Sequence, residues 1–201
     1  MKSEKIFLKI IIGIVAGIIL NILPMYLIQQ KLELPLFMDT LGSITVAFIF
    51  GGVPAIICAT ISQIIMFFVE HYASAIILLY VTTVYAAIGV VCLFRKSLQE
   101  TDSVLNTIFI IFFISILMAL CVSISGGIVN AICIYVQDIT GYAIQDNAAT
   151  SYFQVDLLKM GLSSIPTYIL SRIPSNLIER PIITVISFGI SVMYQKLQKS
   201  E

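Results

Sequence analysis

Residues 37–62 read FMDTLGSITVAFIFGGVPAIICATIS, and this stretch decides how the chain is organised. It falls within a run from 40 to 69 that has no charged side chain, and a single helix over that run would be about 45 Å long. Such a helix is too long for one crossing of a hydrocarbon core of about 30 Å, and the run is too short for two full crossings. Gly51-Gly52-Val53-Pro54 marks the break, because glycine loosens a helix and proline starts a helix better than it continues one. The run therefore predicts two membrane helices, over about 34–50 and 54–69.

The charges of the whole chain follow the same pattern. Only 11% of the 201 residues are charged and 59% are apolar, whereas a soluble domain carries about 25% charged residues. Further runs without a charged side chain cover 10–30, 72–94, 103–137 and 181–195, and a membrane helix needs roughly 20 apolar residues. We therefore expect an all-α polytopic membrane protein with one membrane domain over 1–201. The 11 basic residues balance the 11 acidic ones, which excludes a basic nucleic-acid-binding protein.

The positions of the cations predict the topology. Lys2, Lys5 and Lys9 precede the first apolar run, and Arg95-Lys96 ends the fourth, so these ends are expected in the cytoplasm. With six crossings, both termini lie in the cytoplasm of a cell-membrane protein. The six helices are expected over about 6–28, 34–50, 54–69, 73–94, 104–123 and 177–197.

The segment between the last two helices is harder to interpret. Gly126-Gly127 interrupts the apolar pattern, and polar residues follow at intervals up to the last helix. Whether 157–170 crosses the membrane is not decided by counting Lys and Arg, because both topologies divide these cations equally. Its uncharged part, 160–171, would make a helix of only about 18 Å. This length favours a partly helical cap over about 124–176 on the outer side.

The last helix carries a regular polar stripe. Spacings of three and four residues put its members on one helical face, namely Asn176, Arg180, Thr184, Ser187, Ser191 and Gln195. From Thr184 to Gln195, hydrogen bonding to a neighbouring helix is the favoured explanation of the stripe. Asn176, Glu179 and Arg180 sit at the outer end just after Pro174, where a helix N-terminus attracts anions. These three are candidate substrate-binding residues, and a surface pair of Glu179 with Arg180 is the alternative.

Other polar residues of the outer side complete the expected substrate-binding set. If the second helix reaches full length, Asp39 lies in the outer half of the membrane, where an ionisable residue normally faces a cavity or a partner. A structural salt bridge to Arg180 is the alternative for Asp39. Glu70 and His71 are included as well, although a position at the membrane surface is the favoured explanation for these two residues. Asn130, in the segment that follows the glycine pair, is the last member.

The first helix contains Gly13, Ala16 and Gly17 in a small-residue pattern that suits docking of another helix. Packing within the chain explains this pattern equally well.

Signatures of membrane proteases, hydrolases and ATPases are missing from the sequence, so we expect a protein that is not an enzyme and that has no cofactor and no metal.

Three sequence segments resemble the substrate-binding S components of energy-coupling factor transporters. They are residues 37–62, quoted above, IPSNLIERPIITVISFGISVMYQKL (173–197) and SGGIVNA (125–131). Asp39 falls on the acid of the family's second helix, Asn176 on the asparagine of its sixth helix, and Arg180 near its usual lysine.

The resemblance implies a six-helix, S-component-like bundle that lies in membrane lipid and binds a vitamin-like small molecule on its outer face. Its partners would be a membrane T component and two cytoplasmic ATPase subunits that drive uptake. A sensor or assembly module with the same fold, which does not itself transport, is the alternative.

Overall fold

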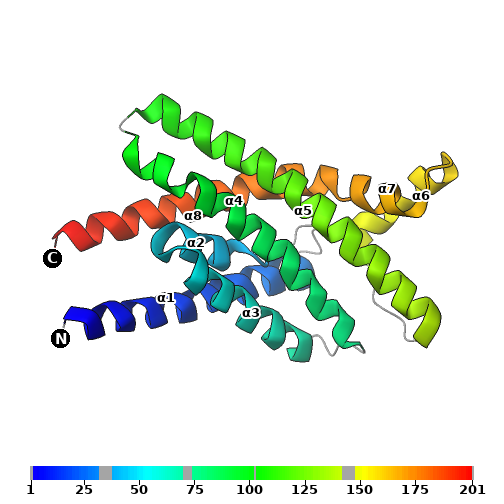
Figure 1. Cartoon of the computed structure of the whole chain (residues 1–201), viewed down its shortest axis with the longest axis horizontal. Coiled ribbons are helices and arrows are strands. Elements are labelled where there is room, and N and C mark those ends of the chain that lie inside the picture. Colours follow the sequence, from blue (N-terminus) through cyan, green and yellow to red (C-terminus); the bar gives the residue numbers. More distant parts are fainter. Residues whose placement is uncertain (1, 32–37, 70–73, 102, 142–147, 201) are drawn as a thin grey trace.

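The computed structural model of the chain describes residues 2–31, 38–69, 74–101, 103–141 and 148–200 (Figure 1). All regular elements in these ranges are helical. In chain order they are α1 Lys2–Met25, the π-helix η1 Tyr26–Lys31, α2 Leu41–Phe50, α3 Gly52–Val69, the 3₁₀-helix η2 Ala75–Tyr80, α4 Val81–Glu100, α5 Val104–Thr140, α6 Ala148–Lys159, α7 Ser164–Leu170 and α8 Ile173–Ser200. The expected all-α class is confirmed.

The structure is that of a multi-pass membrane protein. Within the described residues, five helical stretches are long and apolar enough to cross a membrane: Glu4–Ile28, Gly52–Val69, Ala75–Glu100, Val104–Thr140 and Ser164–Gln198. Large apolar side chains cover their outer surfaces, as with Phe7 on α1 and Phe109 on α5, which are 65% and 62% exposed. Such a surface is suited to lipid and not to water. The second expected helix is described only from Leu41 to Phe50, since residues 32–37 lie outside the described part of the chain.

The helical bundle has two ends, which differ in the elements that lie there (Figure 1). The start of α1 and the end of α8 lie at one end, together with the last turn of α4 and the first turn of α5, and we call this the terminal end. The short helices α6 and α7 lie at the opposite end, which we call the cap end. The short α2 lies in the interior, where it packs on α1, α3, α4 and α8. Eight of its ten residues are buried, with Ile44 and Ala47 completely inaccessible.

Side chains from two other helices bind the ends of α2. At its start, the backbone N–H groups of Gly42 and Ser43 donate to Asn21 Oδ1 of α1 at 2.7 and 3.1 Å. At its end, Arg95 of α4 donates from Nε and Nη2 to the carbonyls of Phe48 and Ile49 at 3.0 and 2.6 Å. The terminal N–H and C=O groups of a helix have no partner within the helix, and hydrocarbon offers none. A short helix can therefore lie inside the bundle only with such partners.

The small residues of α1 pack within the chain. A Cβ on Gly42 would overlap the backbone of Gly17, so α1 and α2 cross in direct backbone contact. A Cβ on Gly13 would overlap the ring of Phe50. Gly13 and Gly17 therefore face α2, which corrects the expectation that they offer a docking face to another subunit. Ala16 is exposed, and a role for it in docking stays a prediction.

The pair Gly126-Gly127 does not end the fifth helix. α5 continues through it to Thr140, a length of 37 residues or about 55 Å, so the expected end near residue 123 is wrong. A Cβ on Gly127 would lie 2.8 Å from both N and Cα of Ile169 on α7. The glycine pair serves close packing between α5 and α7, and sequence alone does not distinguish this use from a helix break.

The cap is consequently smaller than expected. Residues 124–140 belong to α5 and residues 173–176 to α8, so among the described residues of the expected cap only 141 and 148–172 lie outside these two helices. The stretch 157–170 is not one helix, because α6 ends at Lys159 and α7 begins at Ser164 after a turn at Gly161. α7 has seven residues, or about 10 Å, too few to cross a membrane.

Candidate functional site

The polar stripe of α8 faces the interior of the bundle. Its members from Asn176 to Ser191 are at most 6% exposed, whereas Gln195 is exposed. Ser187 Oγ donates to the carbonyl of Leu41 at 3.1 Å and lies 3.1 Å from Thr45 Oγ1, so this part of the stripe joins α8 to α2. The alternative of interhelical hydrogen bonding is therefore what the structure shows for Ser187.

Arg180 is the centre of a buried polar group on the first turns of α8. Its Nη1 donates to Thr40 Oγ1 at 2.7 Å, its Nε to Asn176 Oδ1 at 3.2 Å, and its Nη2 lies 3.2 Å from Glu179 Oε1. Asn176 Nδ2 in turn donates to Ser123 Oγ of α5 at 2.9 Å. We call Thr40, Ser123, Asn176, Glu179 and Arg180 the Arg180 cluster. It connects α5, α8 and the residues that lead into α2.

Glu179 and Arg180 form a buried ion pair, with 0% and 4% of their side chains exposed. Glu179 Oε1 also accepts from the backbone N–H of Met38 at 3.3 Å. The alternative of a surface pair is therefore wrong. Removing two charges from water is costly unless they bind each other and further hydrogen-bonding groups, as they do here.

Asp39 lies beside this pair, immediately before α2. It is partly buried, and its carboxylate is within electrostatic range of both Glu179 and Arg180. The carboxylate bound to Arg180 in the described residues is that of Glu179. The alternative in which Asp39 forms the salt bridge to Arg180 is thus wrong, although the structure does bring the three charges together.

A second polar group lies next to the first, toward the cap end. Arg172 Nη2 donates to the hydroxyl of Tyr80 at 3.0 Å, and that hydroxyl donates to Asn130 Oδ1 at 2.9 Å. The guanidinium also lies over the Tyr80 ring, with its Cζ 5.2 Å from the ring centroid. We call Tyr80, Asn130 and Arg172 the Arg172 cluster. It joins η2, α5 and the turn before α8.

The two clusters share the same helical faces. The backbone N–H of Asn176 donates to the carbonyl of Arg172 at 3.1 Å, so these residues are one helical turn apart. On α5, Ser123 and Asn130 are separated by seven residues, which is two turns. Sequence reasoning missed Arg172 and Tyr80. Extending the stripe of α8 back by four residues from Asn176 would have found Arg172, whereas no comparable signal marks Tyr80.

Glu70 and His71 lie outside the described residues, so their roles stay predictions.

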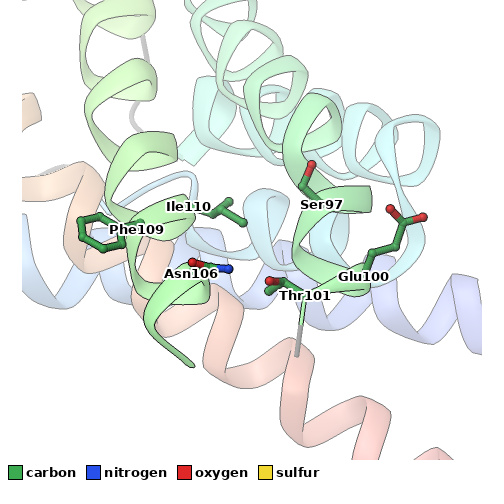
Figure 2. Close-up of a pocket in the computed structure, with 6 residues that line it drawn as sticks. All are labelled: Ser97, Glu100, Thr101, Asn106, Phe109 and Ile110. Atoms are coloured by element: carbon green, nitrogen blue, oxygen red, sulfur yellow. The ribbon is translucent and has the colours of Figure 1, made fainter. Parts of the chain in front are cut away.

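A hollow of about 400 Å³ lies away from both clusters, between the last turn of α4 and the first turns of α5 (Figure 2). It is lined by Ser97, Glu100, Thr101, Asn106, Phe109 and Ile110. Its only charged lining residue, Glu100, is exposed and lies 3.7 Å from Lys96 Nζ. The hollow is open, belongs to the terminal end and contains no residue that the sequence suggested for a site.

Comparisons of the chain with protein-family models, with curated proteins and with solved structures gave no match.

Proposed function

We propose that the chain is the substrate-binding membrane subunit of an energy-coupling factor type uptake system, with an S-component-like bundle of six crossings in the cell membrane. The sixth crossing of this proposal is the one that the sequence predicts over about 34–50, of which the structure describes Leu41–Phe50 as a helix. The cap end is the outer side, where the subunit binds a vitamin-like small molecule. A T component and two cytoplasmic ATPase subunits drive uptake.

The Arg180 cluster, with Asp39 beside it, is the observation that carries the proposal. Glu179, Arg180 and Asp39 come together from two parts of the chain, inside a domain whose outer surface is apolar. Ionisable residues are costly within a membrane domain and usually mark a substrate or ion site. The mixed charges suit a zwitterionic or carboxylated ligand, because Arg180 can bind an acidic group and the two carboxylates a basic or hydroxyl group.

The distribution of cations supports the orientation. Lys5 and Lys9 begin α1, Arg95 and Lys96 lie in the last turns of α4, and Lys196 lies near the end of α8. All five belong to the terminal end, and an excess of Lys and Arg is typical of the cytoplasmic side. This distribution supports an orientation with the termini in the cytoplasm and both clusters toward the outer side.

Native mass spectrometry of the protein released from its own membrane tests the proposal, because it reports bound metabolites and partner subunits together. We expect a bound small molecule and an ATPase pair with the wild type. Arg180→Gln should lose the small molecule, whereas the matched control Lys96→Gln, which removes an exposed cation, should keep it. A metabolite retained by Arg180→Gln would refute the site. A preparation that carries no ATPase subunits would favour the sensor or assembly module.

A further inference from the structure

We propose that the Arg172 cluster binds a carboxylate group of a small molecule. This inference deepens the proposed function by naming the chemical class of the ligand, and it rests on that function only for the claim that the bound molecule is transported.

The first observation is the uncompensated charge of Arg172. Arg180 has Glu179 at 3.2 Å, but Arg172 has no carboxylate within ion-pairing distance among the described residues. The only hydrogen-bond acceptor of its guanidinium among the described residues is the neutral hydroxyl of Tyr80. A partly buried guanidinium is stabilised by an anion, and the structure supplies one to Arg180 and none to Arg172.

The second observation is a surplus of donors. Arg172 Nε and Asn130 Nδ2 are both buried and have no hydrogen-bond partner in the described structure. The Asn130 side chain is only 6% exposed. Buried polar groups are nearly always paired, and both unpaired atoms here are N–H donors. The cluster therefore lacks acceptor oxygens, which is what a carboxylate provides.

The surroundings favour an anion as well. Arg172 directly precedes α8, whose first N–H groups and helix dipole attract negative charge. The Tyr80 ring holds the guanidinium plane in place, which preorganises its N–H groups.

The geometry indicates how a carboxylate binds. Nε and Nη2 form one edge of the guanidinium, and a planar carboxylate accepts from both N–H groups of such an edge. One carboxylate oxygen displaces the Tyr80 hydroxyl from Nη2 and the other takes Nε, while Asn130 Nδ2 donates a third hydrogen bond. The single charge of a carboxylate matches the single charge of Arg172, whereas a phosphate carries more negative charge than this cluster neutralises.

Cysteine labelling tests the proposal with acetate as the probe. Cys133 lies on α5 one turn after Asn130, is 1% exposed and is within electrostatic range of Arg172. A maleimide therefore reaches it only when this region opens, and a bound anion slows labelling by the factor 1 + [L]/Kd. Cys58 is 0% exposed and lies on α3, so it serves as an internal control in the same sample. Peptide mass spectrometry follows both labelling rates in the purified, detergent-solubilised chain.

At about 100 mM acetate and constant ionic strength, with a Kd of about 50 mM, labelling of Cys133 should slow about threefold relative to chloride. Acetamide, the uncharged counterpart of acetate, should not slow it. Arg172→Gln should abolish the protection, and Lys159→Gln, which removes an exposed cation at the same end, should retain it. If Arg172→Gln exposes Cys58, the variant has not folded, and Arg172→Lys is used in its place. Lysine keeps the positive charge but lacks the paired Nε–H and Nη2–H donors of the guanidinium, so this variant should lose most of the protection of Cys133.

Equal labelling in acetate and chloride, or full protection in either Arg172 variant, would overturn the assignment. Protection by inorganic phosphate but not by acetate would overturn the carboxylate. If acetate protects but no metabolite and no ATPase subunits accompany the protein from its membrane, the anion site holds and the transport function fails.

Discussion

Replacing Asn21 by leucine should destabilise the protein because it removes the partner of the first turn of α2. Asn21 is 2% exposed, and its Oδ1 accepts from Gly42 N and Ser43 N. Its Nδ2 donates to Ser43 Oγ at 2.8 Å and to Ser62 Oγ at 2.9 Å, so the same side chain also joins α3. Leucine fills a similar volume but offers no acceptor. Each buried N–H left without a partner costs about 1–3 kcal/mol, so the loss should be about 2–6 kcal/mol.

The free energy of unfolding can be measured by titrating sodium dodecyl sulfate into the protein in a mild detergent and following helix content by circular dichroism. Labelling of Cys58 gives a local measure, because its Sγ lies 3.9 Å from Asn21 Nδ2. The matched control is Asn106→Leu, an exposed asparagine on α5, which should change stability by no more than about 0.5 kcal/mol. If Asn21→Leu is as stable as this control and leaves Cys58 protected, the N–H groups of α2 do not depend on Asn21 and the reasoning is refuted.

Two further substitutions test the packing of the candidate site. Arg180→Met should lower the free energy of unfolding by about 3–5 kcal/mol, because it leaves the Glu179 carboxylate buried without its cation. The double variant with Glu179→Met should recover most of that loss. Equal stability of the single and double variants in the same titration would show that the pair is not coupled. Gly127→Val should displace α7, because its Cβ would lie 2.8 Å from the Ile169 backbone. Backbone hydrogen exchange of 164–170 should therefore accelerate, while that of α2 should not change. Unchanged exchange in 164–170 would contradict the close contact.

The apolar pattern predicts the helices well but not their ends at glycine. The run 40–69 breaks where the sequence indicates, because Gly51 separates α2 from α3. The pair Gly126-Gly127 looks the same in the sequence, yet α5 runs through it. The difference lies in Ile169, whose backbone approaches Gly127 from 42 residues further along the chain. A contact of that separation leaves no signal in the local pattern.

The residues of the candidate site were largely predictable from the sequence, but which of them bind one another was not. Helical spacing places Asn176 and Arg180 on one face, and the structure buries both. Which acid binds Arg180 depends on how the segment before α2 meets α8, and here Met38 and Thr40 bind Glu179 and Arg180 while Asp39 lies beside them. Tyr80 joins the site because η2 lies against α5. Such contacts are set by packing, which periodicity does not encode.

The way α2 is held has a consequence for the order in which the chain is made and inserted. Asn21 precedes α2, so its start can be bound as soon as α2 is synthesised. The carbonyls of Phe48 and Ile49 need Arg95, which follows them by 47 and 46 residues. At about 5–20 residues per second, ribosomes take roughly 2–9 s to add that length. During this interval the two carbonyls at the end of α2 lack Arg95, so we expect the end of α2 to stay beside water or the insertion machinery until α4 has been made.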